Sequence, residues 1–187
     1  MNFDALIDTF VEKVNAYPRE PLYEYEIGPS VRLGASADEI YGQWDWAIKR
    51  YENIYWVENL ETQLPSAFPE SFRSLIKRYI FPHFEFAPIQ FFGNTPEAKA
   101  ELWELRTGIF KDKSLSKCLL EHGFIQFARP DTGDYDAICF DTNSKGRCSE
   151  YSIARIDHES ILCNDKIRVT EILAPSFHEF IERQLEV

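Results

Sequence analysis

Apolar residues recur at helical spacing near the start of the chain. Over residues 2–17 they stand at positions i, i+3, i+4, i+7, i+8 and i+11, as Phe3, Leu6, Ile7, Phe10, Val11 and Val14. This spacing makes one face of a helix apolar, so it predicts an amphipathic helix that ends before Pro18. The segment PLYEYEIG alternates like a short strand, and the capping box Ser36-Ala-Asp-Glu39 predicts a second helix through about Tyr51.

The middle of the chain shows shorter patterns. Helices or helical turns are predicted near Val57–Leu64, near Pro69–Tyr79, from Thr95-Pro96-Glu97 through Leu105 or beyond, and from a Ser114 cap to Gly123. In the second of these, the side chains expected to face inward are Phe72, Leu75, Ile76 and Tyr79. The segment FEFAPIQFF that follows is typical of an apolar strand, which Pro88 places at a sheet edge or splits in two.

The last third predicts an antiparallel meander, a further strand and a closing helix. The strands are Phe124–Arg129, Tyr135–Asp141, about Ser149–Asp157 and near Ile167–Ile172. Turn residues separate the first three strands, and Gly133 among them can adopt a positive φ. A second capping box, Ser176-Phe-His-Glu179, starts the last helix, whose buried side is Phe177, Phe180, Ile181 and Leu185.

These elements together predict one α+β domain over residues 1–187. Its centre is an antiparallel sheet of about four to six strands flanked by helices. The composition agrees with a packed core, because 44% of the residues are hydrophobic and 15% are aromatic. A disordered chain is therefore excluded.

Four motifs carry a resemblance to a known family. They are Leu64-Pro65 followed by the Phe72/Leu75 helix, the stretch FIQFARPDTGDYDAICFD, the strand ending in Asp157-His158-Glu159, and Ala174-x-Ser176-Phe177-x-Glu179-Phe180. In this order and spacing they resemble the SUKH superfamily, which contains bacterial toxin-immunity proteins and fungal cell-wall-synthesis regulators. The resemblance runs from about Trp56 to Leu185. The segment IFPHFEFAPIQFF departs from the Asn-Gly-containing turn that is usual in the family.

The resemblance implies a family core at residues 56–187, with residues 1–55 as an N-terminal helical extension. It implies an immunity-type protein that binds a cognate bacterial toxin and neutralises it sterically. Many toxins countered by this superfamily are nucleases with basic clefts. A general interaction or scaffold module of the same fold, without a toxin partner, is the alternative. A hydrolase with an unrecognised site is a third interpretation, and no motif supports it.

The net charge of −11 favours a basic protein partner over nucleic acid. Residues 1–64 carry 12 acidic and 5 basic groups, residues 65–130 carry 7 and 9, and residues 131–187 carry 12 and 6. Acidity that only maintains solubility is the alternative. No apolar run approaches about 18 residues, and Asp4 and Asp8 stand where a secretory leader would be basic. The sequence therefore predicts a cytoplasmic protein, as a monomer or as a homodimer paired through FEFAPIQFF.

Candidate chemistry is weighed at three places. The turn Asp131-x-Gly133-Asp134-x-Asp136 lacks the ligand spread of a calcium loop and is typical of an acidic turn. Asp157-His158-Glu159 could orient a histidine base, but no nucleophile motif accompanies it. Cys139, with Ala137 on one face of a strand and Ile138 and Phe140 on the other, is predicted to be a buried structural thiol. No zinc-ligand spacing or phosphate loop occurs, so no metal or cofactor is predicted.

Partner-binding candidates come from acids and aromatic residues. On the predicted second helix, Trp46 lies about 200° from Trp44, so both cannot face the core from one side. Trp46 is thus either covered by a second element or an exposed anchor, and the sequence leaves both open. The candidates are Asp45, Trp46, Glu52 and Glu58 near the aromatic residues Tyr51, Tyr55 and Trp56, with Asp131, Asp134 and Asp136 at the strand turn.

Overall fold

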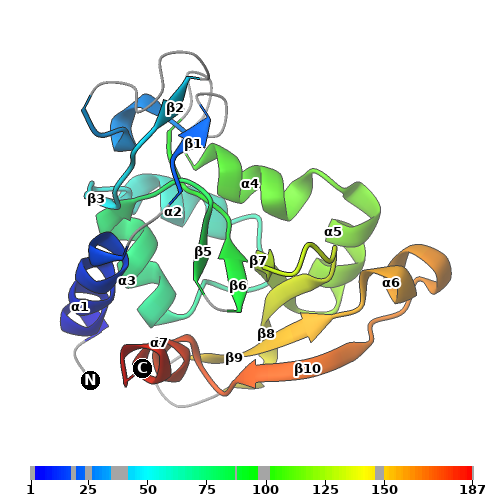
Figure 1. Ribbon diagram of the computed structural model, residues 1–187. Coiled ribbons are helices and arrows are strands. Elements are labelled where there is room, and N and C mark those ends of the chain that lie inside the picture. The colour runs from blue at the N-terminus through cyan, green and yellow to red at the C-terminus, as the bar shows by residue number, and fades with distance from the viewer. Residues whose placement is uncertain are drawn as a thin grey trace.

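The computed structural model describes residues 3–17, 20–23, 27–34, 42–86, 88–96, 102–145 and 150–186. Its centre is a curled six-stranded antiparallel sheet with the order β10-β9-β8-β7-β6-β5 (Figure 1). The strands are β5 (Phe84–Phe86), β6 (Ile89–Phe91), β7 (Phe124–Pro130), β8 (Ala137–Lys145), β9 (Tyr151–Ile156) and β10 (Val169–Ala174). The predicted α+β class with an N-terminal helix is confirmed.

Seven α-helices surround this sheet in the described part of the chain. They are α1 (Phe3–Ala16), α2 (Ile54–Glu61), α3 (Glu70–Arg78), α4 (Trp103–Phe110), α5 (Lys113–Glu121), α6 (His158–Asn164) and α7 (Phe177–Glu186). Figure 1 shows α1 and α7 side by side near both chain ends, where Lys13 Nζ donates to the Gln184 carbonyl at 2.7 Å. α5 and α6 pack together at the opposite end of the sheet. None of the described helices has the length and apolar character needed to cross a membrane.

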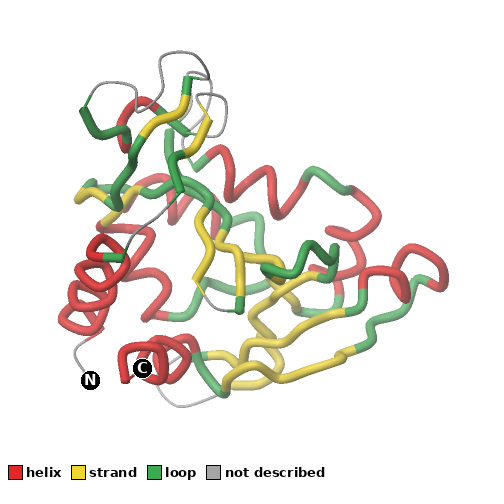
Figure 2. The backbone as a smooth tube through the Cα atoms, viewed as in Figure 1, coloured by secondary structure: helices red, strands yellow, loops and turns green. Residues whose placement is uncertain are grey.

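Short elements join the N-terminal third to this body. The strand β1 (Leu22–Tyr23) pairs with β2 (Gln43–Trp44), and β3 (Lys49–Arg50) pairs with β4 (Tyr79–Ile80), both antiparallel. A 3-10 turn, η2 (Pro29–Val31), lies between β1 and β2 in the chain. In Figure 2 the β1–β2 pair stands apart from the main sheet. Residues 42–50 are thus extended and held by backbone pairing.

The core is densest where aromatic rings from sheet and helices meet. Phe127 on β7 and Phe140 on β8 stack with centroids 4.0 Å apart, and Phe72 on α3 and Phe177 on α7 meet both rings. These four side chains are at most 1% exposed. A smaller apolar cluster on the other sheet face packs under α5 and α6, with Cys139 and Ile156 among its residues.

The structure contradicts the predicted helix through Tyr51. Residues 43–44 and 49–50 form β2 and β3 instead, while the capping box at residues 36–39 lies outside the described residues. The partners that decide this are remote in sequence, since Lys49 pairs with Ile80. Non-local pairing therefore overrides the local helical pattern.

Other predictions need smaller corrections. Pro88 splits FEFAPIQFF into the hairpin β5–β6, which is one of the two outcomes predicted for this segment. The helix α5 is capped by Asp112, whose side chain accepts the backbone N–H groups of Ser114 and Leu115, so Ser114 is not the cap. The helix α6, directly after β9, is absent from the predicted elements.

The C-terminal predictions are largely confirmed. β7, β8 and β9 form the meander, β10 pairs with β9, and Gly133 has a φ of +80°. The Ser176 side chain accepts the Glu179 N–H at 3.0 Å, as the capping box requires. Phe177 and Phe180 are 0% and 3% exposed. The closing helix therefore packs on the sheet through the predicted side chains.

Candidate protein-binding surface

The first turn of α2 exposes three consecutive apolar side chains, which we call the α2 patch. Ile54, Tyr55 and Trp56 are 51%, 68% and 42% exposed. The Tyr55 and Trp56 rings meet edge to face with centroids 5.0 Å apart. Isolated exposed apolar residues are ordinary, whereas a contiguous group is typical of an interaction site.

The packing of α2 explains why this patch faces outward. Val57 and Leu60, three residues apart, are fully buried and supply the stripe that packs on the core. Ile54 and Trp56 stand three residues before Val57 and four before Leu60, respectively, so they flank this stripe and are partly covered, whereas Tyr55 lies on the opposite side of the helix. Tyr51, which precedes the helix, is a further exposed aromatic residue at 38%.

Asn53 begins α2 in an unusual way for a capping residue. Its side chain makes no cap hydrogen bond, and both amide atoms are buried without a partner within the described residues. An asparagine at this position ordinarily accepts an N–H from the first helical turn. A buried polar group without a hydrogen bond reduces stability, so the Asn53 side chain stabilises α2 less than a capping asparagine would.

Acids accompany the α2 patch. Residues 51–72 contain Glu52, Glu58, Glu61 and Glu70 but no Lys or Arg. Glu52 is exposed, and neither a hydrogen bond nor an ion pair engages its side chain in the described part of the structure. Glu58 is 57% exposed and accepts a hydrogen bond from Lys77 at 3.0 Å. Arg73 pairs with both Glu61 and Glu70, so Glu52 is the one acid of this segment that no cation engages within the described residues.

Trp46 does not lie on this surface. It is 5% exposed, with its ring 6.0 Å from Phe84 and its indole N–H donating to the Glu20 carbonyl at 3.4 Å. The prediction of an exposed anchor is wrong at this residue, because the backbone is extended and residues two apart share a side. Asp45 beside it is exposed, and its carboxylate has no partner among the described residues.

The acids of the β7–β8 turn divide into two kinds. The Asp131 side chain is exposed and unpaired within the described residues. Asp134 accepts from Arg155 at 2.9 Å, and Asp136 accepts from the same guanidinium at 2.7 Å. The Asp136 side chain is only 15% exposed. Asp136 therefore belongs to an internal network and is not the exposed rim acid that the sequence suggested.

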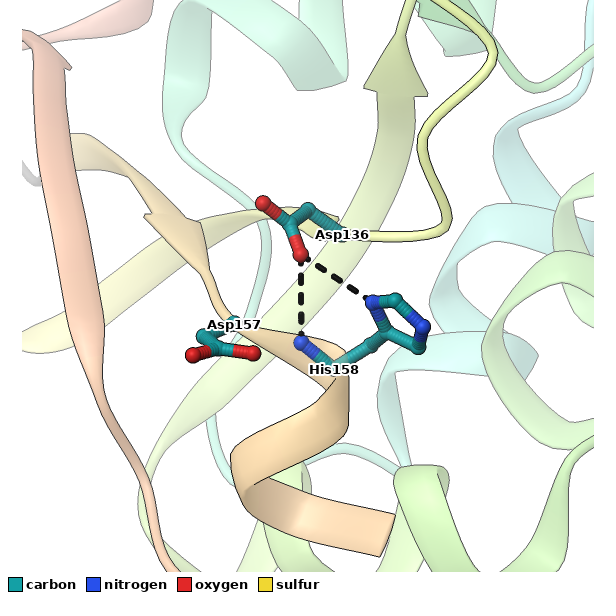
Figure 3. A group of neighbouring side chains, drawn as sticks. All are labelled: Asp136, Asp157 and His158. Carbon is teal, nitrogen blue, oxygen red and sulfur yellow. Dashed lines mark hydrogen bonds and ion pairs between the residues drawn. The ribbon is translucent and has the colours of Figure 1, made fainter.

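That network joins the ends of β8 and β9 to α6. Figure 3 shows one Asp136 oxygen accepting from the backbone N–H of His158, at 3.2 Å, and meeting its ring Nδ1, at 3.1 Å. Asp157 caps α6 by accepting from the Ser160 N–H and hydroxyl. Burial alone would raise the pKa of Asp136, but the hydrogen bonds from Arg155 and His158 outweigh it and hold that pKa below 3.8.

This cluster has the composition of a metal site but not its electrostatics. Asp136, Asp157 and His158 each present a ligand atom, and these atoms lie within 4.8 Å of one another. However, Arg155 already neutralises Asp136, and Arg168 lies 3.4 Å from Asp157. The nearby Ser160 hydroxyl donates to Asp157 and not to His158, so these two residues do not form a nucleophile–base pair. The arrangement is best explained as a structural network that fixes the start of α6.

Two of the described cysteines, Cys139 and Cys118, are poorly suited to thiol chemistry. Burial, and then the nearby Asp141, raises the pKa of Cys139 well above its ordinary value of 9.0. Burial also raises the pKa of Cys118, with Asp165 and Glu121 adding to it. Both are unreactive thiols by this criterion, and the predicted two-faced pattern around Cys139 is confirmed.

The sheet edges are less suited to binding than the α2 patch. At one edge, β5 has three residues. At the other, β10 exposes Val169 and Ile172 at 44% and 55%, but its pairing with β9 shifts register twice. Such irregularities are a known way of blocking edge-to-edge association.

Comparisons with known proteins add no relative. No family model, no curated protein and no solved structure matches the chain. The resemblance to the SUKH superfamily thus stays a prediction that rests on the four motifs. Among the sequence candidates, the structure places Glu58 on α2 three residues from Tyr55, leaves Glu52 exposed just before the helix, and excludes Trp46 from the surface. The sequence already showed Tyr55 and Trp56 as aromatic residues near the candidate acids. It did not show their exposure, which depends on the side of α2 that packs on the core.

Proposed function

We propose that this protein is an immunity-type binding protein that attaches to a cognate bacterial toxin and neutralises it sterically. The single observation that carries protein binding is the α2 patch, in which Ile54, Tyr55 and Trp56 are 51%, 68% and 42% exposed. Tyr and Trp are enriched among the residues that dominate binding energy, because they bury a large area at a small entropic cost.

Charge supports a basic partner. The net charge is −11, and the acids Asp45, Glu52 and Asp131 are exposed without partners within the described residues. Exposed acids of this kind accelerate association with a basic surface and resist an acidic one. A nuclease toxin with a basic cleft has the required chemistry. The toxin identity comes from the SUKH resemblance, and a scaffold module of the same fold stays the second candidate.

A capture experiment in the native host tests protein binding. The tagged chain and a Trp56→Ala variant are used in parallel pull-downs, and bound proteins are identified by mass spectrometry. We expect one basic protein to be enriched on the wild type and depleted on the variant. Trp103→Ala is a matched control, because Trp103 is 43% exposed against 42% for Trp56. Equal capture by all three proteins, or none by the wild type, would contradict binding through the α2 patch.

A growth assay then separates an immunity protein from a scaffold. The captured protein is expressed alone and together with this chain. An immunity function predicts growth arrest in the first case and rescue in the second. A captured protein that is harmless on its own would favour the scaffold candidate. A gene for a toxin domain immediately upstream would favour immunity.

A further inference from the structure

The α2 patch combines two features that recognise the same chemical group. Its Tyr55 and Trp56 rings are exposed, and an aromatic ring attracts a cation placed over its face. Helical spacing puts Glu58 three residues from Tyr55 and four from Ile54, so these side chains are neighbours on the helix surface. A lysine or arginine side chain that reached the rings would also meet a carboxylate.

The cations of this chain do not already fill that role. Among the described basic side chains near α2, Lys77 is 18% exposed and binds Glu58, and Arg73 is 21% exposed and binds Glu61 and Glu70. Arg50 pairs with Asp8 and lies over the Tyr79 ring, 5.2 Å from its centroid. Each of these cations is therefore engaged by another group, and among the described residues no cation lies over the Tyr55 or Trp56 ring.

Asn53 supplies an independent observation at the same turn. Its buried amide has no hydrogen-bond partner within the described residues, and its side chain does not cap the helix. A natural sequence that breaks local stability rules at one place is commonly serving function there. The start of α2 thus combines a buried side-chain amide that has no partner within the described residues with exposed apolar residues.

We infer that Tyr55 and Trp56, together with Glu52 and Glu58, form a recognition site for a lysine or arginine side chain on a basic partner surface. This inference rests on the proposed function and names the partner chemistry of the α2 patch. The aromatic rings supply contact area and cation attraction, while the unpaired Glu52, and Glu58 with its bond to Lys77, disfavour acidic partners. A second copy of this chain is the rejected occupant, since it would bring the same acids face to face.

Fluorine NMR with a defined probe tests the inference without the unknown partner. The four tryptophans are replaced by fluorotryptophan and assigned with single Trp→Phe variants. An oligo-arginine peptide is then titrated, with oligo-glutamate as the control. We expect the Trp56 resonance to shift with oligo-arginine only, and the Trp103 resonance to shift much less. Glu52→Gln with Glu58→Gln should weaken the peptide affinity by about threefold or more, and added salt should weaken it further.

Three results would overturn the inference. They are an unmoved Trp56 resonance, equal shifts at Trp56 and Trp103, and a Trp56 shift that depends on protein concentration without peptide. The last would identify a second copy as the occupant. Failure of the proposed function looks different, because the host pull-down would then return no basic partner while oligo-arginine still shifted Trp56.

Discussion

Two groups of aromatic side chains in this protein have opposite surroundings. Phe72, Phe127, Phe140 and Phe177 are at most 1% exposed and contact one another across helix and sheet. Tyr55 and Trp56 are 68% and 42% exposed and contact each other at the start of α2. The first group accounts for the fold. The second leaves much of its ring surface outside the core, and we propose that this surface binds the partner.

The largest expected effect is in the interior. Phe177→Ala should lower the free energy of unfolding by about 3–5 kcal/mol, because it removes a buried ring from between α7 and the sheet. Phe180→Ala is expected in the same range, since Phe180 is 3% exposed. Chemical denaturation measures both, with Tyr55→Ala as the exposed control, for which we expect a change within about 0.5 kcal/mol. Equal losses for Phe177→Ala and Tyr55→Ala would abolish the distinction between the two groups.

Two buried asparagines extend the comparison, because one has side-chain hydrogen bonds and the other has none within the described residues. Asn94 is fully buried, accepts the Phe81 N–H at 2.9 Å and donates to the Tyr79 carbonyl at 2.8 Å. Asn53 is equally buried but has no side-chain partner in the described part of the chain. Asn94→Ala should therefore reduce stability by at least about 2 kcal/mol, and Asn53→Ala by less than about 1 kcal/mol. Thermal unfolding of the two variants decides this, and a larger loss at Asn53 would show that its amide is satisfied.

The stability of the protein at high pH tests Tyr79, a buried aromatic residue whose hydroxyl has a polar partner. Burial, and then the hydrogen bond to Asp8 at 2.6 Å, raises the pKa of Tyr79 from 10.0 to about 12. The folded state thus keeps a proton that the unfolded state loses. This contribution to stability is complete below pH 10 and disappears as the pH rises toward 12.

The corresponding variant is Tyr79→Phe. It should unfold with a shallower dependence on pH between about 10 and 12 than the wild type, by up to roughly 2 kcal/mol across that interval. Denaturation midpoints measured at several pH values give the slope directly. Identical slopes for the two proteins would mean that Tyr79 does not keep its proton in the folded state.

A smaller effect on stability is expected at low pH from Asp136, which lies where β8 begins and β9 ends. Since the pKa of Asp136 is held below 3.8, its contribution to stability is present above that pH and is lost as the pH falls through the lowered value. Asp136→Asn should be less stable than the wild type at neutral pH, and the difference should shrink in acid. A difference that grew in acid would contradict the structural role of the Arg155 network.

The C-terminal third could be predicted because its signals are local. Alternation of apolar residues defines β7 to β9, Gly133 permits the turn, and Ser176 with Glu179 marks the start of α7. Each signal lies within a few residues of the element that it determines. The N-terminal helix α1 was predictable for the same reason, since its apolar residues recur at i, i+3 and i+4 over about three helical turns.

Residues 42–51 were not predictable from local pattern. Their apolar spacing fits a helix, but β2 pairs with β1 and β3 with β4, and these partners are set by the rest of the fold. The error carried over to the site, because the helical interpretation left Trp46 open as an anchor. Short α6 was missed because its seven residues carry little periodic signal after Asp157.

The candidate site was only partly predictable. The acids Glu52 and Glu58 and the neighbouring aromatic residues were recognised from sequence. Which aromatic residues reach the surface depends on the side of α2 that packs, and this is fixed by Val57 and Leu60 against the core. Exposure thus depends on tertiary packing. The sequence could identify the region, but it could not show that Trp56 is exposed and Trp46 is buried.

Dissociation kinetics of the partner captured from the host test the central claim most directly. Biolayer interferometry compares the wild type, Trp56→Ala and Trp103→Ala, after unfolding curves have shown equal stability. We predict that Trp56→Ala accelerates dissociation by about tenfold while association changes little, and that Trp103→Ala matches the wild type. Equal dissociation rates for all three proteins would contradict the claim that the exposed aromatic residues of α2 hold the partner.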